Sequence, residues 1–540
     1  MLVTKANYCH HDNDTPAGAA GHAGTFLKMS VALSDRPETP RRPLAGAIAR
    51  LVDAGQRLIA ERNEALIVAL ALVAYVALWM LCDTISFYTV NVRTDAREAA
   101  VWAQHFAFGY KHPPMTAWLF ALWFAVFPRT DWSLHLLTMT TIGVTLVITW
   151  RLLRDHLDKN RALFGLAALC LVPLYNLKAP ELNANTAMMP FWAAALLFYL
   201  RARRSLSTPD ALLAGACAAL AFLGKYWSVY LFAGMALAAF VGPATARFWR
   251  SPAPYVMAAA AALVIAPHAY WYFANDGGTN YAFMRQSVMT GDSSATALAK
   301  SAYYILGSIA YAAGPLALLA ALRPNKSALA DIVWPADAMR RQIMILFAVP
   351  LILPALVNLM APYRLTPDWT FPNWALLPIL LYAPASLAID ARKASAAGLI
   401  AFAFAVACVI ASPVIAYAKL AAGPDPERPD SHPVAVLAER LAAKPGRLYW
   451  GSAALTESLP FYLADADRLE DDPLSDIGRD EIAEAGLIVA CLDSDTHCLT
   501  TQAALGAAAG ARRANGTISR SFLGFAAKPI GFRVTVVPAQ

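Results

Sequence analysis

Charged residues are scarce in this chain of 540 residues, and their scarcity excludes most soluble folds. Only 15% of the residues are charged, whereas 58% are hydrophobic and the mean hydropathy is +0.45. A soluble protein of this length needs more charge to cover the surfaces of several domains, so the composition indicates a membrane protein. The formal net charge of +7 is explained by basic loops at one membrane face, and a nucleic-acid partner is not expected.

Cysteine is also scarce, with seven residues in the whole sequence. This number excludes a scaffold built on disulfides, although Cys491 and Cys498 lie close together in polar sequence and either form a bridge or remain thiols. No His/Cys cluster has zinc spacing, and His10 and His11 next to Cys9 fit a disordered polar tail better than a metal site. No nucleotide-binding glycine motif occurs. We therefore expect neither a metal nor a cofactor.

The first part of the chain is polar and lacks the parts of a signal peptide. We expect residues 1–45 to be a disordered cytoplasmic leader, with Met29 as an alternative start. Residues 46–62 place apolar side chains near one helical face and arginines elsewhere, which predicts an interfacial amphipathic helix.

A transmembrane domain is predicted over residues 63–417, because uncharged apolar runs such as Ala65–Leu81 are long enough to cross a hydrocarbon core of about 30 Å. The apolar runs predict about eleven spans, at residues 64–86, 134–150, 162–178, 187–200, 210–224, 226–243, 254–272, 301–321, 342–360, 373–388 and 395–417.

The basic loops give one consistent orientation, with the N-terminus in the cytoplasm and the C-terminal region outside. This orientation requires that the short apolar segment Met115–Phe127 does not cross. We therefore expect an outer loop at residues 87–133, with helices along the outer face between Ala99 and Phe127.

Residues 418–540 are polar and begin with a proline-rich linker, which predicts a separate periplasmic domain. Strands are expected at residues 447–450, 487–491 and 532–537, and helices at residues 433–443 and 500–511. The predicted fold class is thus an all-α polytopic membrane protein with outer juxtamembrane helices and a small C-terminal α/β domain.

The outer loop carries an acid at its start and aromatic and proline residues after it. It reads TDAREAAVWAQH from Thr94 and FAFGYKHPP from Phe106. Asp95 at the membrane boundary fits either a functional carboxylate or a helix N-cap.

This loop resembles that of the bacterial polyprenyl-phosphate-sugar transferases with the C-type glycosyltransferase fold, which include the aminoarabinose transferases of lipid A and relatives of protein O-mannosyltransferases. These proteins typically have an Asp-Glu pair and a later Gly-Tyr-x-x-His-Pro-Pro motif. The resemblance matches Asp95 to the first acid, whereas Ala96 replaces the second and Glu98 follows two residues later. The other matching residues are Gln104, Gly109, Tyr110, His112, Pro113 and Pro114.

The resemblance covers the layout of residues 64–390 and extends to the segment before the span that begins near Thr186. Many members have an Asp there, whereas this chain has Asn185, which can bond a sugar hydroxyl but cannot act as a base. Asp95 is then the stronger base candidate and Glu181 a helper, while Asn183 and Asn185 contact substrate or cap the helix.

Cationic residues in the outer turns are candidates for binding an anion. Lys225 and Tyr226 interrupt a long apolar region and match a Lys-Tyr of the family. Arg364 lies in another outer loop, where it binds the same anion or forms an ion pair with Asp368. Lys111 is a further candidate, and the nearby tryptophans fit an interface belt better than a sugar platform.

The resemblance implies a metal-independent, inverting glycosyltransferase of the bacterial inner membrane. It would move a sugar from a polyprenyl-phosphate donor to a periplasmic acceptor, with lipid A or another envelope glycan ahead of a polysaccharide or a protein. The candidate catalytic residues are Asp95, Glu98 and Glu181. The candidate substrate-binding residues are Tyr110, Lys111, His112, Asn183, Asn185, Lys225, Tyr226 and Arg364. Two alternatives stay open, a flippase of lipid-linked sugars and a lipid-binding relative without activity.

Overall fold

The computed structural model describes residues 43–242, 245–275, 288–425, 429–442, 447–463, 467–469, 471–506 and 510–539. Residues Met1–Ala49 and Arg50–Gln540 form two separate units, and apart from the first residues of α1 the second holds every feature that follows. The predicted leader lies almost wholly outside the described residues.

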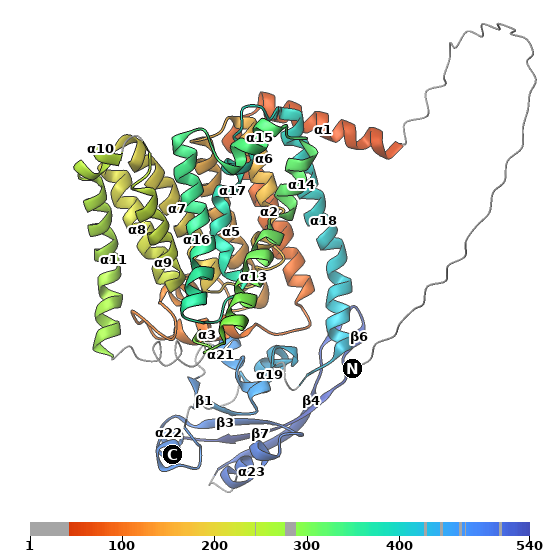
Figure 1. Cartoon of the computed structure of the whole chain (residues 1–540). Coiled ribbons are helices and arrows are strands. Elements are labelled where there is room, and N and C mark those ends of the chain that lie inside the picture. Colours follow the sequence, from red (N-terminus) through yellow and green to blue (C-terminus); the bar gives the residue numbers. More distant parts are fainter. Residues whose placement is uncertain are drawn as a thin grey trace, which may run out of the picture. The chain divides into compact units, whose positions relative to one another are not determined.

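Helices dominate the chain as far as residue 422 (Figure 1). The first half has α1 (Pro43–Glu61), α2 (Glu64–Ser86), α3 (Thr94–Trp102), α4 (Met115–Phe124), α5 (Asp131–Arg154), α6 (Lys159–Leu169), η1 (Pro173–Tyr175), α7 (Ala184–Ser205), α8 (Thr208–Gly224), η2 (Tyr226–Ser228) and α9 (Val229–Ala238). The second half has α10 (Thr245–Arg250), α11 (Ala253–Ala274), α13 (Ser294–Tyr311), α14 (Ala313–Ala321), α15 (Lys326–Val333), α16 (Ala338–Met360), η4 (Pro367–Leu376), α17 (Leu377–Tyr382) and α18 (Ala391–Ala422).

Five of the described helices are long and apolar enough to cross a membrane, namely α2, α5, α11, α16 and α18. A sixth span results if α13 and α14, which meet at a bend of 50°, cross together. α7 is long enough but less apolar, because it begins with polar residues and ends with arginines. The chain is thus a multi-pass membrane protein, although the predicted number of about eleven spans is not confirmed.

Several of the predicted spans are not continuous α-helices. The span expected at residues 162–178 stops at Leu169 in α6, and Pro173 then begins a 3₁₀ turn. The span expected at residues 373–388 consists of η4 and the six-residue α17. Proline lacks the backbone donor of a helix and disfavours the helical conformation in the preceding residue, so Pro372 and Pro378 account for this second break.

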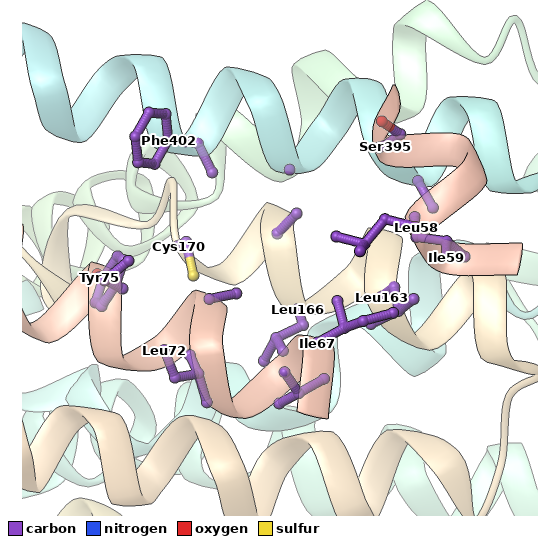
Figure 2. Close-up of a pocket in the computed structure, with 18 of the residues that line it drawn as sticks. Leu58, Ile59, Ile67, Leu72, Tyr75, Leu163, Leu166, Cys170, Ser395 and Phe402 are labelled. Carbon is purple, nitrogen blue, oxygen red and sulfur yellow. The ribbon is translucent and has the colours of Figure 1, made fainter. Parts of the chain in front are cut away.

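Apolar side chains from most of these helices form one large core, in which α7 packs on α5 and α8 while α2 packs on α5 and α18. An apolar cavity of about 250 Å³ lies between α1, α2, α6 and α18 (Figure 2). Leu58 and Ile59 of α1 point toward it, as do Leu72 of α2 and Leu166 of α6.

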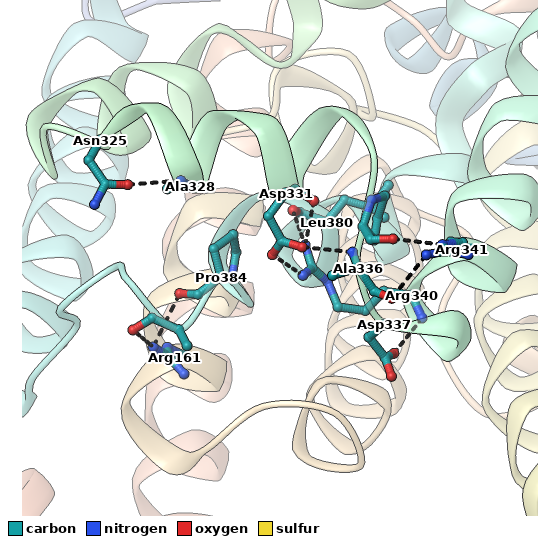
Figure 3. Close-up of polar contacts among 12 residues, drawn as sticks. Arg161, Asn325, Ala328, Asp331, Ala336, Asp337, Arg340, Arg341, Leu380 and Pro384 are labelled. Carbon is teal, nitrogen blue, oxygen red and sulfur yellow. Dashed lines mark hydrogen bonds and ion pairs between the residues drawn. The ribbon is translucent and has the colours of Figure 1, made fainter.

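Arginines hold the turns at one end of the helices (Figure 3). Arg340 of α16 forms an ion pair with Asp331 of α15 and donates to the carbonyl of Leu380 at 3.4 Å. Arg161 of α6 donates to the carbonyl of Leu387 at 2.9 Å. These side chains therefore also satisfy backbone acceptors where helices end.

The C-terminal region is an α/β domain, as the sequence predicts. Its elements are η5 (Pro429–Ser431), α19 (Val434–Leu441), β1 (Leu448–Gly451), α20 (Ala453–Thr456), α21 (Leu459–Tyr462), β2 (Asp467–Arg468), α22 (Asp476–Ala485), β3 (Leu487–Leu492), α23 (Thr496–Leu505), β4 (Arg512–Ile518), β5 (Ser521–Phe522), β6 (Phe525–Ala526) and β7 (Ile530–Val537). Five strands form a mixed sheet in the order β2-β1-β3-β7-β4, and Cys491 and Cys498 form a disulfide at the end of β3.

Candidate functional site

The site begins at α3, the short helix that opens the loop between α2 and α5. Asp95 is exposed in its first turn, where a carboxylate is favoured by the positive end of the helix dipole. The N-cap is Arg93, so Asp95 does not cap the helix and that alternative is excluded. The carboxylate of Asp95 is therefore available to a ligand at the outer surface of α3.

Lys225 lies at the junction between α8 and η2, next to α7 and η4. Its ammonium donates to Oδ1 of Asn185 at 2.7 Å and lies 4.3 Å from the centre of the Trp369 ring. Asn185 belongs to the first turn of α7, whose N-cap is Asn183, so its amide holds the lysine and does not cap the helix. A contact of Asn185 with substrate stays a prediction. Trp369 supports an ammonium through its ring, which is a different role from the interface belt expected from the sequence.

Two acidic and one basic side chain act on Lys225 electrostatically. Burial lowers the pKa of Lys225 to about 7, while Asp95 and Asp368 raise it and Arg364 lowers it further. These effects place charges from α3 and from the segment before η4 within electrostatic reach of Lys225. Asn185 contacts Lys225 directly, whereas Asp95 and Arg364 act on it through their charges.

Arg364 is exposed and makes no ion pair within the described part of the chain. Asp368, its expected partner, instead pairs with Lys178 at 3.2 Å and accepts a hydrogen bond from Tyr311. The alternative of an Arg364–Asp368 pair is therefore wrong. The guanidinium of Arg364 remains available to an anion that binds Lys225.

The aromatic part of the loop contributes Lys111 and His112. Lys111 donates to Oε1 of Glu98 at 2.7 Å, which ties the loop to α3 and gives Glu98 a partner. Burial, with the charges of Lys225 and Lys111, lowers the pKa of His112 to about 4. His112 is thus neutral at pH 7, where it can exchange hydrogen bonds but adds no charge. Tyr110 stacks on Trp102 of α3 at 5.4 Å between ring centres.

His268 of α11 joins this loop to the lysine turn, and the sequence did not single it out. One ring nitrogen lies 2.9 Å from the hydroxyl of Tyr226 and the other 2.5 Å from the carbonyl oxygen of Phe108. The ring of Trp271, one turn further along α11, packs so close to Gly109 that a Cβ there would lie 2.1 Å from it. A buried histidine in an apolar run was the available signal.

Asn183 and Glu181 have structural partners. Asn183 is the N-cap of α7 and forms a capping box with Thr186. Glu181 is buried beneath the start of α3, where it accepts a hydrogen bond from the Arg93 amide at 2.7 Å. Burial raises the pKa of Glu181 to about 8, against the effect of this bond. Both contacts position backbone, and direct roles of these two residues toward a substrate stay predictions.

Metal-binding groups of three or more His, Cys, Asp or Glu residues are absent from the described part of the chain. The Cys9, His10 and His11 cluster lies outside it.

Comparison with known proteins supports the predicted resemblance. Residues 111–271 match the profile of a family described as dolichyl-phosphate-mannose-protein mannosyltransferases. The structure aligns with that of ArnT from Cupriavidus metallidurans bound to undecaprenyl phosphate, with a TM-score of 0.56 and 13% identity over 86% of this chain and 97% of that one. The chain has an ArnT-like fold.

The apo structure of the same ArnT gives a similar result, with a TM-score of 0.55 and 13% identity over 87% of this chain and 97% of that one. No curated protein matches the chain in sequence. The structural alignment covers far more of the chain than the 161 residues of the family match.

Proposed function

We propose that the chain is an inverting glycosyltransferase that moves a sugar from a polyprenyl-phosphate carrier to an acceptor at the periplasmic face of the inner membrane. The observation that carries the proposal is the electrostatic interaction of Asp95, at the start of α3, with Lys225, at the end of α8. A transfer of this kind needs a base for the acceptor hydroxyl and cations for the departing phosphate. The ArnT-like fold and the undecaprenyl phosphate bound to that ArnT support a lipid-phosphate donor.

Asp95 is the proposed base. Its carboxylate is exposed and lies on a helix whose other faces are held by the protein. It would take the proton of the acceptor hydroxyl while the oxygen attacks the anomeric carbon from the side opposite the phosphate. The bond between that carbon and the phosphate oxygen breaks, so the configuration inverts.

Lys225 and Arg364 are the proposed ligands of the departing phosphate. Both are cationic residues whose charges interact, and neither has a carboxylate within ion-pair distance among the described residues. Lys111 can also attract the phosphate, although its charge is partly offset by the ion pair with Glu98. Basic side chains suffice to neutralise a lipid phosphate, so the proposal includes no metal or other cofactor.

The proposed location is the bacterial inner membrane, with the N-terminus in the cytoplasm and the α/β domain in the periplasm. The acceptor we expect is lipid A or another envelope glycan, because both are exposed at that face. The prenyl chain of the donor would lie along the apolar helices.

The test compares Asp95→Asn with Asp210→Asn, because Asp210 lies in the first turn of another helix, α8. Cells that lack the gene are complemented with each variant, and their envelope lipids and glycans are measured by mass spectrometry. Asp95→Asn should lower transfer by about 10²-fold or more while binding of the polyprenyl phosphate persists. Asp210→Asn should restore the missing sugar as the wild type does.

Equal rescue by wild type and Asp95→Asn would contradict the assignment of the base. If whole lipid-linked precursors accumulate without the gene and both chains clear them, the protein transports the lipid and does not transfer the sugar.

A further inference from the structure

The α/β domain contacts the helix that carries Asp95. Residues Glu457–Tyr462, here called the docking segment, include α21 and lie against α3. Arg97 of α3 forms an ion pair with Oε2 of Glu457 at 3.0 Å and donates to Oγ of Ser458 at 3.4 Å. Arg97 is only 6% exposed, so its charge depends on these partners.

An apolar contact lies next to this ion pair. Phe461 of the docking segment is fully buried in a small core together with Ala96 and Ala99 of α3. Its ring meets that of Phe124 in α4 at 5.7 Å between centres. The docking segment therefore contributes part of the core on which α3 packs.

This core also explains why Ala96 stands where the family resemblance places a second acid. Ala96 is fully buried against Phe461 and its neighbours. A glutamate there would have to lose its hydration without an ionic partner in the apolar core, which is costly. The docking segment thus makes position 96 apolar, and an alanine fits there where a second acid would not.

The chain on both sides of α3 is held by the same domain. Arg520 donates to the carbonyls of Val90 at 2.5 Å and Tyr88 at 3.1 Å, in the segment that leads into α3. Tyr462 donates to Asp131 at 2.8 Å, where the loop enters α5. The domain thus fixes the start and the end of the loop as well as α3.

We propose that the α/β domain sets the position of Asp95, with Glu457 as a positioning residue that acts through Arg97. This inference rests on the proposed function, because it assigns the domain a part in the same transfer. Arg97 and Asp95 are two residues apart on α3, one buried against the docking segment and the other exposed. Loosening Arg97 would allow α3 to shift or fray, and Asp95 would move with it.

The test uses the full-length protein in lipid nanodiscs and replaces Glu457 by Gln, which removes the charge without altering α3. The turnover number should fall roughly tenfold, since small displacements of a reacting group are costly, while KM for the donor stays within about twofold. Hydrogen–deuterium exchange should rise in the peptide that covers residues 94–102. Glu457→Asp keeps the charge with a shorter reach and should recover part of both effects.

The matched control is Asp493→Asn, which breaks an exposed pair with Arg533 at 3.0 Å in the same domain. It should change neither exchange in α3 nor turnover. A double variant with Arg97→Gln and Glu457→Gln should lose no more than the worse single variant, because both changes remove the same pair.

Wild-type turnover and wild-type exchange in Glu457→Gln would overturn this inference while leaving the transferase proposal intact. If the wild type transfers no sugar, yet exchange in residues 94–102 rises in Glu457→Gln alone, the domain positions α3 and the proposed reaction is wrong.

Discussion

The amide of Asn185 accepts a hydrogen bond from the ammonium of Lys225 at 2.7 Å, which joins the start of α7 to the end of α8. An amide orients this lysine without neutralising it, whereas a carboxylate at the same distance would form an ion pair. The neutral partner thus leaves the charge of Lys225 for an incoming anion. The family's usual Asp at this place would compete with a phosphate for the same ammonium.

Asn185→Asp should therefore weaken binding of a polyprenyl phosphate. The new carboxylate would raise the pKa of Lys225 and pair with it, and we expect an affinity loss of about tenfold, which corresponds to about 1.4 kcal/mol. Binding to protein in nanodiscs, followed by native mass spectrometry, measures the change. Asn183→Asp is the matched control, because the same substitution two residues earlier falls on an N-cap, where Asp serves as well as Asn. Equal losses in both variants would count against Lys225 as the phosphate ligand.

Binding of the lipid phosphate should also depend on pH through Lys225. Its pKa in the free protein is about 7, so its ammonium is charged below this pH and loses its proton above it. Affinity should therefore fall as the pH rises from 7 to 9. Lys225→Arg should bind with an affinity that is nearly constant over this range, because a guanidinium stays protonated. A wild-type protein whose affinity does not change between pH 7 and 9 would show that Lys225 does not titrate against the phosphate.

Gly109→Ala should displace the aromatic loop, because the added Cβ would lie 2.1 Å from the Trp271 ring. Overpacking of this kind typically costs about 1–3 kcal/mol of stability. Thermal unfolding in detergent and donor affinity should both decline. Adding Trp271→Ala should restore them in part, since it removes the clash. Gly398→Ala is the control, because nothing lies within 4 Å of the position that its methyl group would take and Ala favours the helix α18.

Local patterns predicted much of the helical part and named most of the residues that meet at the site. The predicted first span has the bounds of α2, because an uncharged apolar run decides both. Asp95, Lys225 and Asn185 stood out as polar residues at the ends of apolar segments. The segments 162–178 and 373–388 are not continuous helices, because prolines shorten helices that composition alone would continue.

Contacts between distant parts of the chain could not be predicted in the same way. Arg97 looks like an ordinary helix charge until Glu457, 360 residues later, is seen beside it. His268 likewise connects Phe108 and Tyr226, which lie on other elements, and the sequence does not indicate these contacts. Sequence periodicity reports burial but does not identify the partner, so these links needed the fold.

The disulfide between Cys491 and Cys498 allows a test of the proposed orientation. Such bonds persist in the periplasm and are rare in the cytoplasm, so the α/β domain should carry it if the domain faces outward. Alkylation of the denatured protein without reductant should label five of the seven cysteines, since seven minus the two bonded ones leaves five. Prior reduction should expose all seven, and mass spectrometry counts the labels. Cys491→Ser should leave one new reactive thiol at Cys498. Seven labels without reductant, in protein purified with thiols blocked at lysis, would place the domain in a reducing compartment and reverse the predicted topology.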